Sequence, residues 1–542
     1  MSTLKPPPKE HAAREQWSSP YGFILAAVGS AVGLGNIWRF PGVAYENGGG
    51  AFLVPYLVAL LVAGVPILLL DYSLGHRYRG SSPAVFRRIG RRFEPLGWFH
   101  VAISFVIITY YAVILAWAIR YTMFSVNLAW GDDTVGFFVG EYLQLGDPAF
   151  NLDVVGGVFW PLLAIWVVAA IVMARGVTRG VELANRLFLP LLTIMFLALV
   201  VRAMFLPGAS DGLNQFFTPN WGALADAGVW IAAFSQIFFS LSIAFGIMIT
   251  YSSYLPRRSN LAPTGFVTAF ANSSFELLAG FGVFATLGFM AFQQGVGVGE
   301  LSGIKGVALS FMTFPQVISM MPGGPVFGVL FFGSLVLAGF TSLISLLQVV
   351  SAALQEKFGI RRQVASLVVT GTTGLLSVVL FSTTNGLNAL DVVDKFANEV
   401  GIVIAAIAMT LVVGLGLRML PTLRTHLNRT STARVGKWWD IAVGIVNPLM
   451  LIVMFGITLA ALLREGYGGY PTSFVGIFGW GAFAFMVVAA FGFSAIPWRT
   501  PVDDFDPVRV HDRADDALVD APEPLRVETL ERLSDDDEGG RR

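Results

Sequence analysis

The sequence predicts an all-α polytopic membrane protein. Hydrophobic residues make up 55% of its 542 residues and charged residues only 13%, a balance that soluble domains do not have. The chain contains many separate apolar runs of about 20 residues, the length that a helix needs to cross the hydrocarbon core. These runs are too long and too continuous for a transmembrane β-barrel, whose strands alternate over about 10 residues.

We predict twelve spans from the apolar runs. They lie near residues 19–42, 50–76, 97–125, 154–174, 182–206, 227–255, 262–292, 325–356, 363–384, 390–418, 437–464 and 473–497. Residues 301–322 are moderately apolar but contain Pro315, so we predict a helical external loop there. Residues 130–152 carry four acidic side chains and are predicted to form a loop.

Basic residues mark alternate loops and predict the orientation. The loop after the second span holds six arginines, and the loops after spans 4, 6, 8 and 10 hold two to five basic residues each. The odd-numbered loops are nearly free of Lys and Arg. Because basic loops stay on the cytoplasmic side, the even loops and both termini are predicted to be cytoplasmic. We expect a multi-pass protein of the plasma membrane, surrounded by lipid.

Several function classes are excluded or disfavoured. The chain has no cysteine, which excludes disulfides, thiolate metal sites and cysteine nucleophiles. It has no GxSxG, HExxH or P-loop motif, and its five histidines are scattered, so no enzyme is predicted. The net charge of zero gives no reason to expect a nucleic-acid partner. The sequence does not indicate an oligomeric state.

Spans 1 and 6 each contain a weak point near mid-membrane. Span 1 has Gly29, Gly33 and Gly35, and span 6 has the softer segment 240–246. Glycine lowers helix stability, and a backbone group freed in lipid must bind protein, water or a ligand. The two weak points lie five spans apart and so run in opposite directions, the pattern of an inverted repeat with a binding site at the midplane. Close helix packing through Gly29 and Gly33 is the alternative.

The inverted repeat suggests how the chain is organised. We predict a cytoplasmic N-terminal segment 1–18, a first repeat 19–206 with spans 1–5, a second repeat 227–418 with spans 6–10, a pair of further spans in 437–497, and a disordered cytoplasmic tail 500–542. The N-terminal segment is polar and has no cleavable signal pattern.

Several separated motifs resemble the neurotransmitter:sodium symporter family. They are GSAVGLGNIWRFP at 29–41, ENGGGAF at 46–52, QIFFSLSIAFG at 236–246 and AGFTS at 338–342. The likeness runs in order from Trp17 through span 10. It implies the LeuT fold with discontinuous spans 1 and 6, and sodium-coupled transport of an amino acid by alternating access.

The resemblance implies two sodium sites. The first would use the Ala31 carbonyl and the side chains of Asn36, Ser240 and Asn272, completed by the substrate carboxylate. The second would use the carbonyls of Gly29, Val32 and Ala338 with the hydroxyls of Thr341 and Ser342. Taken singly, Asn272 could equally form an interhelical hydrogen bond, and the two hydroxyls could bond back to their own helix.

The resemblance also implies a substrate site. The carboxylate would meet the amides of Leu34 and Gly35 and the hydroxyl of Tyr111, and the ammonium would meet carbonyls around Ala31, Phe239 and Ser240 with the Ser242 hydroxyl. Ile107, Phe239, Phe245, Leu343 and Leu346 would line an apolar side-chain pocket. Amine carriers of the family have aspartate where this chain has Gly33. Glycine leaves room for an α-amino acid that brings its own carboxylate. The apolar lining predicts a neutral side chain, and Ala244, where glycine is common, and the bulky Leu343 predict a small-to-medium aliphatic one. Core packing for the apolar residues, and an interfacial position for Tyr111, are the alternatives.

Charged residues near the two ends of this site resemble gates. Arg39 and Asp394 would close the outer side with Phe245 as a lid, and Arg14, Trp17, Tyr254 and Glu356 would close the inner side. A static ion pair and a solvated surface are the respective alternatives.

Glu276 lies where chloride-dependent members have serine. Its fixed carboxylate predicts transport without chloride. Asp71 replaces a more usual glutamate, and its role stays open. A proton-coupled carrier of the same fold and a sensor that binds an amino acid without moving it are the alternative functions.

Overall fold

The computed structural model describes residues 16–304, 306–429 and 431–507. The chain divides into the unit Met1–Thr500, which contains every helix discussed below, and the unit Pro501–Arg542. In the second unit only residues 501–507 are described, with a single 3-10 turn at Val502–Asp504. The predicted disordered tail otherwise lies outside the described residues.

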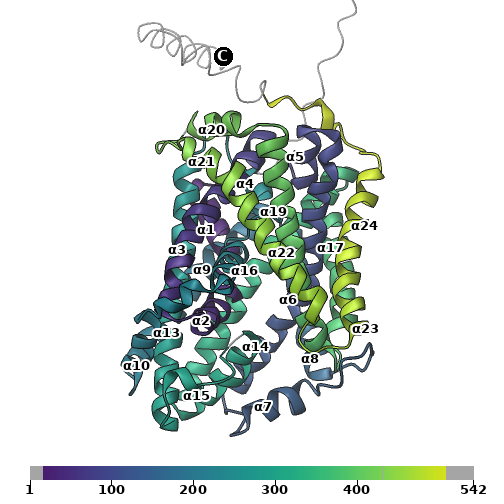
Figure 1. Ribbon diagram of the computed structural model, residues 1–542. Coiled ribbons are helices and arrows are strands. Elements are labelled where there is room, and N and C mark those ends of the chain that lie inside the picture. The colour runs from purple at the N-terminus through teal and green to yellow at the C-terminus, as the bar shows by residue number, and fades with distance from the viewer. Residues whose placement is uncertain (1–15, 305, 430, 508–542) are drawn as a thin grey trace, which may run out of the picture. The chain divides into compact units, whose positions relative to one another are not determined.

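The described part of the first unit confirms a helical membrane protein (Figure 1). Ten helical stretches are long and apolar enough to cross a membrane: Gly50–Tyr78, Arg91–Phe124, Gly156–Ala174, Val177–Met204, Leu261–Gln294, Gly324–Phe358, Arg362–Phe381, Gly386–Gly416, Lys437–Glu465 and Thr472–Ala495. An eleventh is a broken pair, Pro20–Ala31 and Gly35–Glu46, bent by 51°. The predicted sixth span is present as two short helices, so twelve spans are reached when these are joined.

The principal helices are labelled as in Figure 1. They are α1 (Pro20–Ala31), α2 (Phe40–Glu46), α3 (Leu53–Ala59), α4 (Val65–Tyr78), α6 (Glu94–Phe124), α8 (Gly156–Ala174), α9 (Leu183–Met204), α11 (Ala227–Ser240), α12 (Ile247–Ser252), α13 (Leu261–Gln294), α16 (Gly324–Phe358), α17 (Arg362–Phe381), α18 (Gly386–Lys395), α19 (Val403–Thr410), α22 (Asn447–Glu465) and α24 (Gly481–Ala495).

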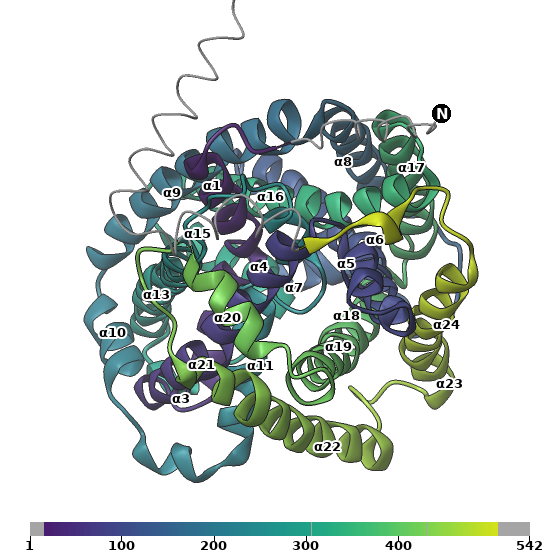
Figure 2. The same ribbon diagram turned by 90° about the horizontal axis from the view of Figure 1, so that it is seen from above.

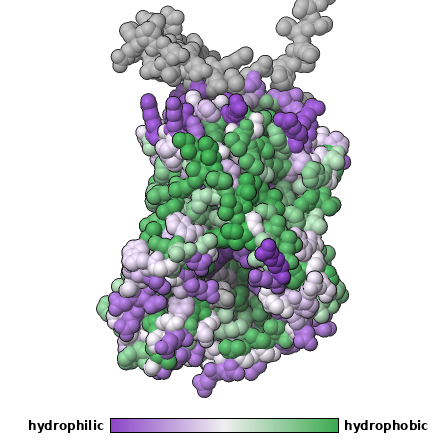
Figure 3. Space-filling view, in the orientation of Figure 1, coloured by the Kyte–Doolittle hydropathy of each residue, from purple (hydrophilic) through white to green (hydrophobic). Residues whose placement is uncertain are grey.

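The helices form a centre and a surrounding ring. Seen along the bundle, α1, α4, α6 and α16 lie toward the middle, and α8, α9, α17, α22 and α24 lie toward the rim (Figure 2). The most apolar part of the α6 span is 89% buried, whereas that of the α9 span is only 28% buried. Apolar side chains form a band across one face of the bundle (Figure 3). The rim helices therefore present their apolar surface to lipid, and the central helices hold the polar groups.

The connecting segments contain more helix than the sequence predicts. The predicted loop 130–152 includes α7 (Thr134–Gly136) and a following π-helical turn, Phe137–Tyr142. The predicted helical loop 301–322 is confirmed as helical and contains α14 (Gly306–Ala308) and α15 (Phe314–Met320). Three further helices, α5 (Ser82–Ile89), α10 (Ala209–Phe217) and α20 (Leu420–Arg429), lie between spans. The helices outside the spans lie at the two ends of the bundle. The end with α5 and α20, at the top of Figure 1, is called the Trp17 end below, and the end with α7, α10 and α15 is called the α15 end.

The first broken span has a clear local cause. Ser19 caps α1 by accepting a hydrogen bond from the Gly22 amide (3.0 Å), and Pro20 suits the first helical position. The helix ends at Ala31, shortly before Gly33 and Gly35. A π-helical turn, Gly35–Arg39, then leads into α2. Pro41 has no amide to donate to the carbonyl four residues earlier, which favours irregular winding before it.

The second broken span is opened by three left-handed residues. Between α11 and α12, Ser242, Ala244 and Gly246 have φ of 54°, 64° and 91°. Only glycine adopts this conformation without cost, so the segment is strained at the other two positions. The predicted weak segment 240–246 therefore coincides with the observed break.

Hydrogen bonds join the second break to three other spans, two through side chains of those spans and one through its own Ser242 side chain. The Ser242 hydroxyl donates to the Ser30 carbonyl of α1 (3.0 Å). The Ala244 amide donates to the Asp71 carboxylate of α4 (3.1 Å), and Ser104 of α6 donates to the Phe245 carbonyl (2.9 Å). These contacts satisfy backbone groups that a helix would otherwise pair internally.

Candidate functional site

The two breaks face each other across a buried central pocket of about 40 Å³. It is lined by Ser30, Ala31, Gly33, Gly35, Asn36, Ile107, Tyr111, Phe239, Ser242, Phe245, Ile247, Ser342, Leu346 and Asn398. Most residues predicted to bind substrate are among them. Leu34 instead lines a neighbouring cavity, and Ser240 and Leu343 are buried outside the lining.

Gly33 sits where no side chain fits easily. A Cβ atom there would lie 2.7 Å from the Ser342 hydroxyl and 3.1 Å from the Tyr111 hydroxyl. The Tyr111 hydroxyl accepts a hydrogen bond from the Leu34 amide (3.4 Å), as the sequence placed it beside this backbone. A cluster of hydroxyl and amide groups thus surrounds a buried, non-helical stretch of main chain.

The side chains predicted for the first sodium site form one connected chain. The Asn36 amide group donates to the Asn272 side-chain oxygen (2.8 Å), and the Asn272 amide group donates to the Ser240 hydroxyl (3.2 Å). The Asn36 oxygen accepts from the Gly33 amide (2.9 Å). All three side chains are buried, so helices α11 and α13 are joined to the first break through hard oxygen and nitrogen groups.

Three of the residues predicted for the second sodium site, Ala338, Thr341 and Ser342, are hydrogen-bonded to one another on α16. The Thr341 hydroxyl donates to the Ala338 carbonyl (2.9 Å), and the Ser342 hydroxyl lies 3.3 Å from the same carbonyl. Ser342 also lies 3.2 Å from the Ser30 carbonyl of α1, which ties α16 to the first break. The back-bonding considered as an alternative is therefore present, together with a contact between the two helices.

Glu276 is buried in α13 within a hydrogen-bonded group. Its carboxylate accepts from the Gln236 side chain (2.6 Å) and from the Tyr56 hydroxyl. The Gln236 nitrogen also lies 3.5 Å from the Gly35 carbonyl. This carboxylate is therefore close to the first break and is held by neutral donors.

A larger cavity of about 240 Å³ lies on the side of the pocket toward the α15 end. Its lining includes Arg39, Asp394, Leu34 and Tyr111, and no hydrogen bond or ion pair joins the side chains of Arg39 and Asp394, both of which lie in the described part of the chain. The Arg39 guanidinium lies 4.6 Å from the centre of the Phe239 ring, and Asp394 accepts from Asn398 (2.8 Å). The predicted outer gate pair thus borders one cavity without closing it.

Two tyrosines bind Asp391, which lines this cavity together with Tyr467. The hydroxyls of Tyr467 and Tyr470 donate to the Asp391 carboxylate at 3.0 and 3.1 Å. Burial, and then the Asp391 charge, raise the pKa of both phenols above its usual value. Both groups therefore stay protonated and keep donating to Asp391.

The Trp17 end is closed by packing. The Trp17 indole donates to the Tyr251 carbonyl (2.9 Å), and its ring lies edge-on to Tyr251 and Tyr254. Gln348 donates to the Tyr254 hydroxyl (2.8 Å), and Glu356 accepts from the amide and hydroxyl of Ser81 (2.8 and 2.7 Å). Arg14, the fourth residue predicted for this gate, lies outside the described residues.

Some site residues were not found from the sequence. Ser104 and Asn398 contact the breaks or line the pocket, and Asp71, which had no assigned role, holds the Ala244 amide. The only feature of the sequence that could have identified them is that each is a polar residue within an apolar span, a position typical of functional residues in membrane proteins. Tyr56 and Gln236 carried the same signal and bind Glu276.

The architecture and the pocket define a class of protein. A helical membrane bundle with two interrupted helices around a central pocket is typical of secondary transporters built from inverted repeats. The model of the Sodium:neurotransmitter symporter family matches residues 14–135 and 130–499. The chain belongs to this family. It is a transporter and not an enzyme, and membership in the family supports coupling to sodium.

Known proteins agree with this assignment. An uncharacterized sodium-dependent transporter of Methanocaldococcus jannaschii is 39% identical over 488 residues, which cover 89% of this chain and 97% of that protein. The sodium- and chloride-dependent GABA transporter 2 of Bos taurus is 30% identical over 424 residues, 71% of this chain and 70% of the relative.

A solved structure agrees as well. MhsT in complex with L-phenylalanine is 31% identical, with a TM-score of 0.70, and the match covers 82% of this chain and 99% of that one. The resemblance and the predicted LeuT fold are thereby confirmed.

Proposed function

We propose that the protein is a sodium-coupled symporter of a neutral α-amino acid. The observation that carries this proposal is the connected chain Asn36–Asn272–Ser240 beside the open backbone at Gly33. Side-chain oxygens together with the Ala31 carbonyl would bind a sodium ion there, and the substrate carboxylate would complete its ligands. Each ligand would then raise the affinity for the other by the same factor.

The substrate would bind with its carboxylate at the amides of Leu34 and Gly35 and at the Tyr111 hydroxyl. Its ammonium would meet the carbonyls of the two breaks and the Ser242 hydroxyl. The apolar lining from Ile107, Phe239, Phe245 and Leu346 favours an uncharged apolar side chain. We propose a small-to-medium aliphatic amino acid. Since MhsT was solved with L-phenylalanine, aromatic amino acids are the competing choice.

A second sodium ion would bind between α1 and α16. The carbonyls of Gly29, Val32 and Ala338 and the hydroxyls of Thr341 and Ser342 would supply its ligands. Binding there would replace the back-bonds of the two hydroxyls and hold α1 against α16.

Transport is proposed to be independent of chloride. The fixed carboxylate of Glu276 would supply the negative charge that a bound anion supplies elsewhere, although the GABA transporter relative is chloride-dependent by name. Uptake in gluconate should therefore equal uptake in chloride, and Glu276→Ser should make uptake depend on chloride.

Alternating access would be achieved by the two gates. Spans 1, 2, 6 and 7 would rock against the remaining spans, Arg39 would pair with Asp394 to close the α15 end, and the packing around Trp17 would open. The distribution of Lys and Arg supports an external α15 end and a cytoplasmic Trp17 end in the plasma membrane.

The decisive experiment is uptake into proteoliposomes. Radiolabelled leucine, alanine and phenylalanine would be offered with an inward gradient of sodium or of potassium. We expect accumulation only with sodium, and loss of accumulation in Asn272→Ala. Equal uptake in potassium would overturn sodium coupling and favour a proton-coupled carrier, while binding without accumulation would favour a sensor.

A thermal-shift screen of the amino acids, with and without sodium, would identify the substrate. We expect the largest stabilisation from an aliphatic amino acid in sodium. An amine without a carboxylate as the best stabiliser would contradict the proposed role of Gly33.

A further inference from the structure

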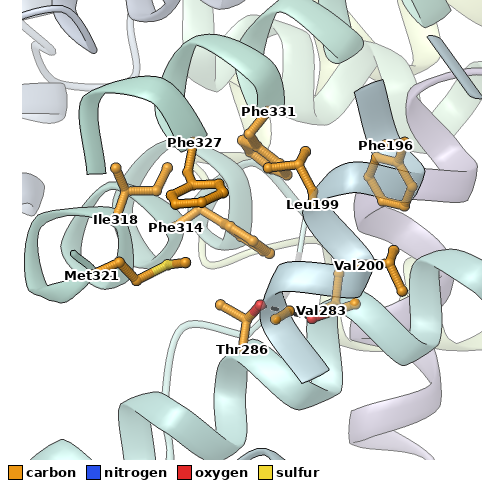
Figure 4. Close-up of a pocket in the computed structure, with 12 residues that line it drawn as sticks. Phe196, Leu199, Val200, Val283, Thr286, Phe314, Ile318, Met321, Phe327 and Phe331 are labelled. Carbon is orange, nitrogen blue, oxygen red and sulfur yellow. Dashed lines mark hydrogen bonds between the residues drawn. The ribbon is translucent and has the colours of Figure 1, made fainter. Parts of the chain in front are cut away.

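An apolar pocket lies between four helices on the lipid-facing side of the bundle, near the α15 end (Figure 4). It is separate from the central pocket and shares no lining residue with it. Helices α9, α13, α15 and α16 form its walls, and the enclosed part holds about 30 Å³. The side chains that dominate it are Phe196, Leu199, Val283, Phe314, Phe327 and Phe331.

The side chains that line this pocket are almost all apolar. Phe314 of α15 stacks on Phe331 of α16 with ring centres 4.2 Å apart. The one hydroxyl in the lining, that of Thr286, donates to the Gly282 carbonyl of its own helix (2.7 Å). A site with no free polar partners does not hold ordered water but takes an apolar ligand.

The rim of the pocket belongs to the lipid-exposed surface. On α9, next to the lining residues Leu199 and Val200, Leu197 and Val201 are 47% and 49% exposed. On α16, Val326 beside Phe327 is 63% exposed. Apolar side chains this exposed on spans of a membrane protein contact acyl chains, so lipid has direct access to the pocket.

A cation lies at the rim. The Arg202 guanidinium of α9 lies 5.6 Å from the centre of the Phe327 ring, which lines the pocket. Within the described residues no hydrogen bond or ion pair engages the Arg202 side chain, which is half-buried. An arginine on a membrane span is costly unless it finds a partner, and lipid phosphate is the anion available at this surface.

We propose that this pocket binds a membrane phospholipid, with the part of one acyl chain next to its ester between α9, α13, α15 and α16 and the phosphate on Arg202. The small enclosed volume suits a few methylene groups of a flexible chain better than a rigid ring system. The single cation at the rim suits one phosphate group.

The site would act on the outer cavity through the segment of α14 and α15. Gly306 and Val307 at its beginning line the outer cavity, whereas Phe314 and Ile318 further along line the lipid pocket. An acyl chain against Phe314 and Ile318 would oppose movement of the whole segment. Lipid at this site would therefore tune opening and closing at the α15 end.

Photo-crosslinking of the full chain in nanodiscs tests the proposal. The probe is a phosphatidylglycerol with a diazirine on one acyl chain near its ester, and the adducts are located by peptide mass spectrometry. We expect adducts concentrated on the walls of the pocket, in residues 196–203, 282–286 and 314–331. Adducts spread evenly over the lipid-facing spans would overturn the proposal.

Matched variants separate the two parts of the site. Arg202→Gln should lower crosslinking in the pocket about fivefold, the effect of one basic side chain on an anionic lipid, and Arg202→Lys should restore it. Arg120→Gln is the control, because Arg120 also lies over a phenylalanine, Phe124, at the end of a span but lines none of the pockets described above. Equal losses in Arg202→Gln and Arg120→Gln would overturn the assignment of the phosphate.

A filling variant tests the acyl chain. Ala203→Phe adds a ring inside the pocket and should abolish the adducts there, whereas Ile194→Phe adds the same ring on the exposed face of α9 and should leave them unchanged. A cooperative thermal unfolding transition in both variants, close to that of the unchanged protein, would show that they fold. Stronger labelling by a photoreactive sterol or free fatty acid than by the phospholipid would overturn the choice of ligand. Because crosslinking does not require transport, its result is independent of the proposed substrate.

Discussion

At the scale of single residues, Ala244 is held in an unfavourable conformation at the centre of the second break. Its φ of 64° suits glycine, and an L-residue there costs about 1–3 kcal/mol. We expect Ala244→Gly to raise the free energy of unfolding by about 1 kcal/mol and Ala244→Val to lower it, as measured by thermal unfolding in detergent. Ala279→Gly, within helix α13, should be destabilising. Equal losses in Ala244→Gly and Ala279→Gly would contradict this.

Gly33 gives a second prediction at this scale. Aspartate there would place a carboxylate between Ser342 and Tyr111, where the substrate carboxylate is proposed to bind. Because like charges repel strongly in a buried site, Gly33→Asp should weaken amino-acid binding at least about 100-fold in a sodium-dependent binding assay. The control is Gly140→Asp, at an exposed glycine with no neighbour near its Cβ position. Unchanged affinity in Gly33→Asp would place the carboxylate elsewhere.

Single residues also show how far sequence reasoning reaches. The positions that motifs single out, such as Asn36, Asn272 and Tyr111, are brought together as predicted. Leu343 is apolar and one helical turn from the lining residue Leu346, yet it packs outside the pocket. The face of α16 that Leu343 occupies depends on the tilt and rotation of packed helices, which the sequence does not encode locally.

At the scale of elements, a buried ion pair joins α6 to α16 at the Trp17 end. Glu94 accepts from Lys357 (2.6 Å), from Arg87 (2.7 Å) and from the indoles of Trp98 and Trp498 (3.0 and 2.7 Å). Lys357 is fully buried. Removing one partner of a buried pair leaves an uncompensated charge.

Glu94→Ala should therefore destabilise the protein by about 3–5 kcal/mol in thermal unfolding. Glu399→Gln, in the partly exposed pair with Lys395, should cost less than about 1 kcal/mol. Similar losses in the two variants would show that the buried cluster contributes no more than a surface pair. Trp498→Phe, which removes one donor to Glu94, should fall between them.

Elements were predicted with uneven success. Long apolar runs determine ten of the spans in the described part of the chain, because length and hydropathy are sufficient for a membrane helix. Of the helices between spans, those of the loop 301–322 were predicted and others, such as α10, were missed, since short helices depend on tertiary contacts, here with α13. The break in span 6 was predicted from Ser and Gly content, but its three partners, Ser30, Asp71 and Ser104, come from other spans and could not be read from the segment itself.

At the scale of the whole molecule, one end is closed by packing and the other holds a cavity. Trp17 is 4% exposed, whereas Arg39 and Asp394 border a cavity of about 240 Å³. Trp17→Ala should open the Trp17 end, because loss of a buried Trp costs about 3–5 kcal/mol of packing.

Single cysteines can measure this opening, because the chain has none of its own. Ser345 is fully buried and bonded to Tyr251, directly behind Trp17. A maleimide should modify Ser345→Cys more than about tenfold faster in the Trp17→Ala background, given the lost packing. Ser366→Cys, buried in α17, should stay slow in both. Equal rates at position 345 would contradict the gating role of Trp17.

Three hydrogen bonds hold the second break, and they differ in whether the proposed rocking of spans 1, 2, 6 and 7 would break them. If spans 1, 2, 6 and 7 rock as one body, the bonds from Ser242 to Ser30 and from Ala244 to Asp71 travel with it. Of these three bonds, only the one from Ser104 in span 3 to Phe245 joins the rocking spans to the remaining spans. Losing one such bond costs about 1 kcal/mol, which slows a step less than tenfold. In such a motion the break would be held within the moving body and would add little to the activation barrier of the transport cycle.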